Sequence, residues 1–287
     1  MRIFMATLSL LVTMLSTTQA QAQVVEASHA EIRFDTIDVP GAGSTAADIN
    51  NRGVIVGWAG TEGGFVAIDD LIVRMQGPVL ELLEPNAIND RGHVVGVNHS
   101  TFQGFFLANG VMSPIEAPGG RNTIPRGINN RGQIVGSAYV EEEVRSFLLA
   151  GGEYASIQFP GSLVTRANGI NDRAQIVGDF AGDDGIYRGF FWFQGRFTTI
   201  EVPNRGYTRA NAINNLGLIV GGTASSPEAD MSGFLLWNGR FSIIHIPGSS
   251  WTEVRGINDR GRIVGYYVDD IGVHGFEADV YQFVGHQ

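Results

Sequence analysis

One eleven-residue pattern occurs six times in this 287-residue chain and restricts its fold more than any other feature. The clearest copy, residues 255–265, reads Arg-Gly-Ile-Asn-Asp-Arg-Gly-Arg-Ile-Val-Gly. Successive copies lie 39, 40, 42, 43 and 44 residues apart, counted between their central asparagines Asn50, Asn89, Asn129, Asn171, Asn214 and Asn258. A repeat of this length is typical of one four-stranded blade of a β-propeller. The pattern therefore predicts an all-β propeller.

One repeat unit, from Gly189 to Gly233, contains four short segments with the features of strands. Residues 196–202 alternate between two unlike faces, which is the period of a β-strand, and three shorter runs are bounded by turn residues. Two of the four connections are tight, of the Asn-Gly and Asn-Asp-Arg-Gly types, and the other two are longer. Alternate connections of an up-and-down blade lie on opposite faces. We therefore expect the tight turns on one face and the variable loops on the other.

The two ends of the chain carry complementary parts of one blade. The segment 33–40 matches the second strands at 196–203 and 240–247, but no first strand precedes it. The last copy ends with a first strand, from residue 275 onward, that has no second strand after it. Pairing the ends completes a sixth blade and removes free sheet edges. We predict a six-bladed β-propeller of four-stranded blades over residues 31–287, closed by a blade shared between the N- and C-termini.

The N-terminal residues have the features of a secretory signal peptide. Arg2 supplies the positive end, residues 3–15 the apolar segment, and residues 20–22 (Ala-Gln-Ala) a small-residue cleavage site. A transmembrane anchor is the alternative, but hydroxyl residues interrupt a run that is already short for spanning a bilayer. We predict a signal peptide at 1–22 and a lead-in segment at 23–30. The mature protein is then secreted or periplasmic, without membrane insertion.

The charge and the composition limit the partners. The formal net charge is −10 at pH 7, and a nucleic-acid partner requires a basic face, so we expect no nucleic-acid binding. All 19 basic residues are arginine and there is no cysteine. This composition excludes lysine Schiff bases, thiol nucleophiles and cysteine-ligated zinc. The remaining partners are a small molecule, a glycan or another protein, and we expect a monomer.

The turn that follows each Ile-Asn has a mechanical explanation. Asparagine hydrogen-bonds its own turn, and the glycine three positions on supplies a positive φ. The fourth copy has Ala174 instead of glycine, which predicts strain of roughly 1–2 kcal/mol at that turn. Six asparagines in a ring also suggest a metal site formed by carbonyl oxygens. Every copy retains most of the turn pattern, however, so we favour the interpretation that each asparagine braces its own hairpin.

The Gly-Phe, Asn-Gly and Ile-Asn-Asp-Arg-Gly-x-Ile-Val-Gly elements together resemble the extracellular repeats of the HAF family, over residues 31–287. The His-Ala-Phe that gives the family its name corresponds here to His274-Gly275-Phe276, and other residues occupy the histidine position in the other five copies. The resemblance implies a secreted, propeller-like repeat protein. It implies no particular activity.

The face with the variable loops is the expected binding face, since sites are usually placed on loops. These loops include residues 97–103, 137–145 and 179–188. Equivalent positions in them hold chemically different residues, as a site on a symmetric scaffold requires, although drifting surface loops have the same appearance. With the aromatic residues expected to be exposed there, the candidate ligand-binding residues are Gln103, Arg145, Arg188, Ser232, Trp58, Tyr266 and Trp251.

Two functions remain open at this point. The first is a binding or interaction module for a glycan or protein, and the second, suggested only by analogy with six-bladed lactonases, is a calcium-assisted hydrolase of lactones or esters. In the second, the cation would polarise the carbonyl, and an acidic residue or His274 would transfer the proton. The acidic residues Asp183, Asp184, Asp269 and Asp270 are calcium-ligand candidates, or else solvated loop ends. Neither Gly-x-Ser-x-Gly nor His-Glu-x-x-His occurs, so we favour binding.

Overall fold

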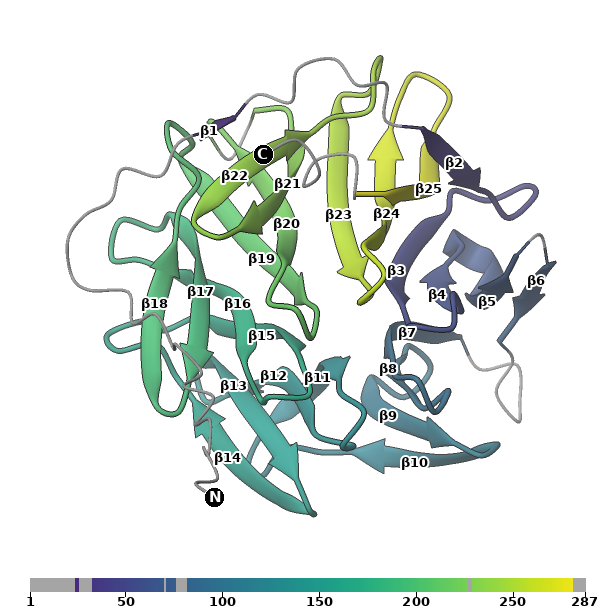
Figure 1. Cartoon of the computed structure of the whole chain (residues 1–287). Helices are drawn as coiled ribbons and strands as arrows, with labels where there is room; N and C mark the ends of the chain where they lie inside the picture. The colour runs from purple at the N-terminus through teal and green to yellow at the C-terminus, as the bar shows by residue number, and fades with distance from the viewer. Residues whose placement is uncertain (1–23, 26–32, 70, 76–81, 227–228, 281–287) are drawn as a thin grey trace, which may run out of the picture.

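The computed structural model describes residues 24–25, 33–69, 71–75, 82–226 and 229–280, and these form a six-bladed β-propeller (Figure 1). Each blade has four strands, and neighbouring strands within a blade are antiparallel. In blade order, the strands are β3 (Thr45–Ile49), β4 (Ile55–Trp58), β5 (Gly64–Ile68) and β6 (Leu71–Arg74); β7 (Leu83–Ile88), β8 (Val94–Asn98), β9 (Gln103–Ala108) and β10 (Val111–Ile115); β11 (Arg121–Ile128), β12 (Ile134–Val140), β13 (Glu143–Ala150) and β14 (Glu153–Ile157); β15 (Thr165–Ile170), β16 (Ile176–Ala181), β17 (Tyr187–Phe193) and β18 (Arg196–Ile200); β19 (Tyr207–Ile213), β20 (Ile219–Ala224), β21 (Ser232–Trp237) and β22 (Arg240–Ile244); and β23 (Trp251–Ile257), β24 (Arg262–Val268), β25 (Val273–Asp279) and β2 (Phe34–Ile37).

The innermost strand of each blade is the one that ends at the Ile-Asn of the repeat. The strands that pack next to one another around the axis are β3, β7, β11, β15, β19 and β23. Going outward, the next strand begins at or near Ile-Val-Gly, and the third carries Gly-Phe. In five blades the outermost strand follows a tight turn of the Asn-Gly type, and in the sixth it is β2. A blade therefore begins in the middle of one sequence repeat and ends in the middle of the next. The repeat period alone did not specify this order.

The predicted closure is confirmed. β2 is the outermost strand of the sixth blade and pairs antiparallel with β25, from Phe34 opposite Ala278 to Ile37 opposite Gly275. From the lead-in segment, β1 (Val24–Val25) pairs in parallel with the outer strand β22 of the preceding blade. The predicted signal peptide at 1–22 lies outside the described residues. Among the residues that the structure describes, no helix is long and apolar enough to cross a membrane.

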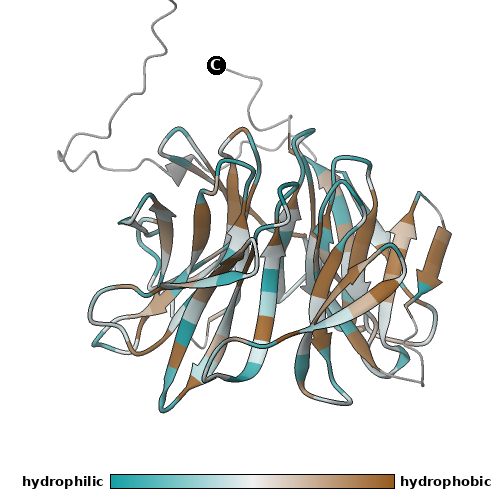
Figure 2. Ribbon diagram, turned by 90° about the horizontal axis from the view of Figure 1, so that it is seen from below, coloured by the Kyte–Doolittle hydropathy of each residue, from teal (hydrophilic) through white to brown (hydrophobic). Residues whose placement is uncertain are grey.

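The two faces divide the connections as expected. Because the strands are antiparallel, the Ile-Asn and Asn-Gly turns lie at one end of the propeller and the longer connections at the other. Both ends are largely hydrophilic, and the hydrophobic residues concentrate in the strands between them (Figure 2). Two of the predicted loops are wrong in extent. Most of residues 137–145 form the hairpin of β12 and β13, and β16 continues to Ala181. Ser137 and Asp179 made these strands resemble polar loops, although both side chains are buried.

A close contact inside the blades explains the constant glycine of Ile-Val-Gly. A Cβ atom on Gly178 would lie 1.9 Å from the carbonyl oxygen of Arg166 and 2.7 Å from Cζ of Phe190. The phenylalanine comes from the Gly-Phe element on the next strand outward, and it is fully buried. Equivalent contacts of glycine with backbone and phenylalanine occur in four other blades, at Gly57, Gly136, Gly221 and Gly265. The two sequence elements therefore pack against each other.

The central asparagines brace their own turns, as predicted, and they also join the blades. In Asn214, for example, Oδ1 accepts the N–H groups of Leu216 and Leu218 at 3.0 and 2.9 Å. Its Nδ2 donates to the carbonyl oxygen of Asn258 in the next blade, at 3.0 Å. The same inter-blade bond recurs in every blade, and Asn258 returns to Asn50 at 3.1 Å. These six bonds form a closed inner ring, so the side chains act as a structural brace.

The residues that follow these asparagines form a second closed ring, which we call the Asn/Asp ring. Around the axis it alternates Asn51, Asp90, Asn130, Asp172, Asn215 and Asp259. Each asparagine donates its amide hydrogens to the Oδ2 atoms of both neighbouring aspartates, at 2.7–3.0 Å. Each backbone N–H of the ring also donates to Oδ1 of the next residue. The ring therefore couples all six blades through polar contacts.

We expect Ala174→Gly to stabilise the fold. Ala174 has a φ of +58°, and the equivalent glycines have φ values from +76° to +90°. A left-handed conformation costs an L-residue about 1–2 kcal/mol, and the greater flexibility of glycine in the unfolded chain cancels part of that gain, about 0.5–1 kcal/mol. The melting midpoint should therefore rise by roughly 1–3 °C. A lower midpoint in a thermal melt would show that the strain at the alanine is smaller than the cost of the added glycine flexibility.

Candidate functional site

All six innermost strands carry a β-bulge at the same position of the repeat. In β11, the pairing with β12 passes from Pro125 to Gly127, and Arg126 is left without a partner in the register. A bulge redirects its side chain and is frequent beside functional sites. The six residues at this bulge position are Ala47, Asn86, Arg126, Asn168, Asn211 and Arg255.

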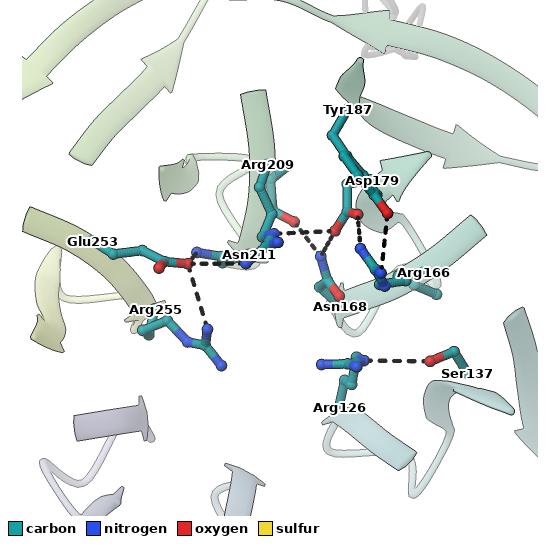
Figure 3. Close-up of polar contacts among 12 residues, drawn as sticks. Arg126, Ser137, Arg166, Asn168, Asp179, Tyr187, Arg209, Asn211, Glu253 and Arg255 are labelled. Atoms are coloured by element: carbon teal, nitrogen blue, oxygen red, sulfur yellow. Dashed lines mark hydrogen bonds and ion pairs between the residues drawn. The ribbon is translucent and has the colours of Figure 1, made fainter. Parts of the chain in front are cut away.

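The six bulge residues all line one cavity on the propeller axis. Its volume is about 220 Å³, and Arg166, Asp179 and Arg209 complete the lining. Figure 3 shows Arg126 and Arg255 extending into the central space from different blades. Equivalent positions of a symmetric scaffold therefore hold an asymmetric set of charged, polar and small residues, as a grafted site requires.

Two buried carboxylates contact three of the four guanidinium groups. Asp179, with a fully buried side chain, lies 3.1 Å from Arg166 and 3.6 Å from Arg209. Glu253, just behind the cavity wall, lies 3.4 Å from Arg255 and 3.8 Å from Arg209. Burial opposes the negative charge of Glu253, but the two arginines, together with the hydrogen bonds from Asn211 and Tyr266, lower its pKa. Four guanidinium groups and two carboxylates leave the site with excess positive charge, in a chain whose net charge is −10.

Arg126 is the cation with the least compensation. Within the part of the chain that the structure describes, its one side-chain hydrogen bond runs from Nε to Oγ of Ser137, at 3.5 Å. Burial, together with the charge of Arg255, lowers the pKa of Arg126 to about 10 despite the opposing influence of Asp179. The group still carries its charge at neutral pH. β11 and β23 belong to the third and sixth blades of the ring, so Arg126 and Arg255 approach the axis from opposite sides.

The far end of the site is closed. A smaller space of about 90 Å³ continues from the bulge residues toward the tight-turn face and ends at the two asparagine-containing rings. Consecutive atoms of the Asn/Asp ring are 2.7–3.0 Å apart, which leaves no passage for an organic molecule. Asp48 lines this space and accepts the N–H groups of Ile49 and Ile88, while burial raises its pKa to about 7. A ligand must therefore enter from the loop face.

Most of the ligand-binding residues predicted from sequence lie away from this cavity. Gln103, Arg145, Arg188 and Ser232 are at or near the start of the third strand of different blades, and the first three contact nearby carboxylates. Ser232 is buried. The structure does not bring these four residues together.

The three predicted aromatic residues are in strands and are half-buried, so the expectation that they are exposed on loops is wrong. Trp58 ends β4, with its ring 5.2 Å from that of His99. Trp251 begins β23 opposite Val268 of β24. Tyr266 is outside the cavity lining but contacts a carboxylate behind it, because its hydroxyl donates to Oε2 of Glu253 at 2.9 Å.

The acidic loop residues do not converge. Asp184 forms an ion pair with Arg188 at 2.7 Å, and Asp269 accepts the N–H groups of Ile271 and Gly272. Asp183 and Asp270 are adjacent to these in sequence, on two different blades. Within the described ranges, no group of three or more histidine, aspartate or glutamate side chains is placed to hold a metal ion. Calcium binding stays a prediction.

His274 lies at the closure of the ring. Its Nδ1 is 2.9 Å from Oδ2 of Asp38, just after β2, and its Nε2 is 3.3 Å from Oδ1 of Asp269. Its ring stacks on Tyr267, with 5.0 Å between centroids. The hydrogen bond to Asp38 has the largest effect and raises the pKa of His274. Burial, the next largest, lowers the pKa, and the charges of both carboxylates raise it further, so that the net pKa is raised. Protonated His274 therefore links the N-terminal strand to the last blade.

We expect this link to make stability depend on pH. Since the folded pKa lies above the unfolded value of about 6.5, the stabilisation is complete below about pH 6.5 and is lost as the pH rises through the folded pKa. The melting midpoint of the wild type should exceed that of His274→Gln most at low pH, and the difference should shrink at alkaline pH. The same difference at pH 5.5 and pH 9 would contradict the assignment.

The central site was missed because its residues do not look like a motif. The signal was present three positions before each central asparagine, where an otherwise regular pattern holds alanine, asparagine or arginine. Variation at one position of a constant motif indicates a special role, but only the bulge shows that the position faces the axis.

No protein-family model and no curated protein matches the chain. Solved structures match its fold. A gluconolactonase from Xanthomonas campestris superposes with a TM-score of 0.54 at 10% identity, over 83% of this chain and 86% of that one. Virginiamycin B lyase from Staphylococcus aureus gives 0.50 at 11% identity over 87% and 100%, and AofleA from Arthrobotrys oligospora gives 0.50 at 12% over 87% of each. The chain is thus a six-bladed propeller, structurally similar to lyase and gluconolactonase propellers.

Proposed function

We propose that this protein is a binding module whose central cavity takes a small anionic molecule from the loop face. The observation that supports this most strongly is the pair Arg126 and Arg255, which approach the axis from opposite blades. Arg126 has no carboxylate within ion-pair distance among the described residues, and an anion between the two guanidinium groups would supply the missing charge. Guanidinium groups bind carboxylates, phosphates and sulfates through paired hydrogen bonds.

The same charges disfavour the alternative, a calcium-assisted hydrolase of lactones or esters. Four guanidinium groups line the cavity, and the two carboxylates near them are already in contact with arginine. A divalent cation there would meet like charge at short range. The likeness to gluconolactonase at 10% identity concerns the fold alone. The proposal also includes export to the periplasm or the cell exterior, which the signal-peptide pattern supports. It includes a relation to HAF repeat proteins, which the repeat pattern supports.

Arg126→Gln tests the proposal in two ways. It should abolish the rise in melting midpoint caused by phosphate, sulfate or malonate, because only the folded protein has the site. Without ligand, it should raise the midpoint, because it removes a partly buried charge that has no carboxylate partner among the described residues. Calorimetric titration of the same anions should show binding weakened by about tenfold or more.

Arg240→Gln is the matched control. Arg240 is exposed at the start of β22, so the substitution makes the same change in net charge outside the cavity. General salt effects on stability, such as those of sulfate, should be equal in the two variants. The proposal fails if no anion binds the wild type, or if Arg126→Gln and Arg240→Gln respond to the anions alike.

A further inference from the structure

The orientation of two amide groups in the cavity is fixed by their neighbours. Nδ2 of Asn168 donates to Oδ1 of Asp179 at 2.8 Å and to the carbonyl oxygen of Ala210 at 3.0 Å. Both partners are acceptors, so the nitrogen of the amide has to face them. Both amide hydrogens of Asn168 are thereby used, and its Oδ1 can only accept a hydrogen bond from elsewhere.

Asn211 repeats this arrangement in the next blade. Its Nδ2 donates to Oε1 of Glu253 at 2.9 Å and to the carbonyl oxygen of Val254 at 2.8 Å. No described residue donates to Oδ1 of either Asn168 or Asn211, and neither oxygen is enclosed by protein atoms. Both residues line the cavity. The site therefore offers two hydrogen-bond acceptors whose polarity cannot be reversed by turning the amide.

The six bulge positions thus present a defined pattern around the axis. Arginine donors stand at two opposite positions, and acceptor oxygens stand at the two adjacent positions on one side between them. The other side holds the small Ala47 and Asn86, whose Nδ2 donates to the carbonyl oxygen of Pro125 at 2.9 Å. A ligand that is only anionic, such as an inorganic oxyanion at neutral pH, satisfies the arginines and offers few hydrogens to the amide oxygens. The complementary molecule carries an acid group together with hydroxyl donors.

We propose that the ligand is a hydroxylated acid, with its anionic group between Arg126 and Arg255 and its hydroxyl groups donating to Oδ1 of Asn168 and Asn211. This inference rests on the proposed function and names the ligand class of the same site. The cavity volume of about 220 Å³ lies below the roughly 300–1,000 Å³ of pockets for drug-sized ligands, which fits a single sugar acid. Its closed far end limits a longer ligand to one terminal residue.

The test compares three ligands of similar size by calorimetric titration of the unaltered protein. Galacturonate has both the acid and the hydroxyl groups, cyclohexanecarboxylate has only the acid, and galactose has only the hydroxyl groups. We expect galacturonate to bind at least about tenfold more tightly than cyclohexanecarboxylate, because a site with unfilled acceptors discriminates against the deoxygenated analogue. Galactose should bind more weakly than either acid.

Two variants separate the contributions. Arg126→Gln should weaken both acids by similar factors, whereas Asn168→Ala should reduce the preference for galacturonate and retain cyclohexanecarboxylate binding. Asn168 also holds Asp179, and Asn211 holds Glu253, so Asn211→Ala removes one acceptor beside a different carboxylate. A reduced preference for galacturonate in both variants points to the acceptor oxygens, and melting curves confirm that each variant is folded.

The outcomes distinguish this inference from the proposed function. Equal or tighter binding of cyclohexanecarboxylate, still dependent on Arg126, overturns the hydroxylated ligand and leaves an anion site. Failure of both acids to bind overturns both proposals. A free sugar acid and the acidic end of a glycan share this chemistry, and trigalacturonate separates them. If trigalacturonate binds more tightly than galacturonate, the ligand is the acidic end of a glycan. If it binds equally or more weakly, the ligand is the free sugar acid.

Discussion

Asn214→Ala should lower the free energy of unfolding by about 3–5 kcal/mol, one of the largest effects expected of a single truncation in this protein. The side chain is 4% exposed, accepts the N–H groups of Leu216 and Leu218, and donates to the carbonyl oxygen of Asn258 in the next blade. Truncation leaves all three backbone groups without that partner, and an unpaired buried polar group costs about 1–3 kcal/mol. The melting midpoint should fall by roughly 6–15 °C.

Leu216→Ala is the control for this experiment, because Leu216 is at the tip of the same turn and is 50% exposed. Its effect should lie within about 0.5 kcal/mol of zero. Asn214→Gln tests position as well as chemistry, since one additional methylene moves the amide away from its three partners. A small loss for Asn214→Ala, comparable to that for Leu216→Ala, would show that the inner ring contributes little to stability.

Gly221→Ala should have a still larger effect and leave little folded protein. The new methyl carbon would lie 1.9 Å from the carbonyl oxygen of Arg209 and 2.9 Å from Cε1 of Phe234. The first of these atoms belongs to the innermost strand, so the backbone of the blade has to move. Overpacking that forces backbone shifts typically costs about 1–3 kcal/mol, and this contact is closer than usual, so we expect more than about 4 kcal/mol. Soluble yield and the melting midpoint measure the loss.

Gly239→Ala provides the matched substitution in the same blade. Gly239 lies in the turn between β21 and β22 with a φ of +76° and open space where Cβ would be, so only the left-handed conformation costs about 1–2 kcal/mol. Adding Phe234→Leu to Gly221→Ala should not restore stability, because the contact with the Arg209 oxygen remains. Recovery of stability in the double variant would show that the added methyl group clashes with the phenyl ring of Phe234 and not with the backbone of Arg209.

The sequence was most informative where a residue is used in the same way in every blade. The central asparagines, the turn glycines and the exception at Ala174 were all interpreted correctly, because local hydrogen bonding and a positive φ determine them. The closure was also predictable, since the two end segments are recognisable halves of one repeat. These features depend on contacts that are local or that recur at a fixed interval.

The candidate site could not be predicted in the same way. Arg126 and Arg255 are far apart in sequence, and only the order of strands from the axis outward brings them to one level. Asp179 was assigned to a loop because a charged residue in a strand looks unfavourable until Arg166 and Asn168 are seen beside it. Polar residues that face an axis and polar residues that face solvent have the same pattern in sequence. The predicted ligand-binding residues Gln103, Arg145, Arg188 and Ser232 were selected because equivalent positions hold different residues, but they lie on separate blades and do not form one site.

The alternation of the Asn/Asp ring has a consequence for how this architecture can change in size. Asparagine donates on both sides and aspartate accepts on both sides, so a closed circle of this kind needs equal numbers of each. Loss or gain of a single repeat would bring two aspartates, which repel, or two asparagines into contact at one junction. The Asn/Asp ring therefore requires an even number of blades, and we expect repeats to be gained or lost in pairs.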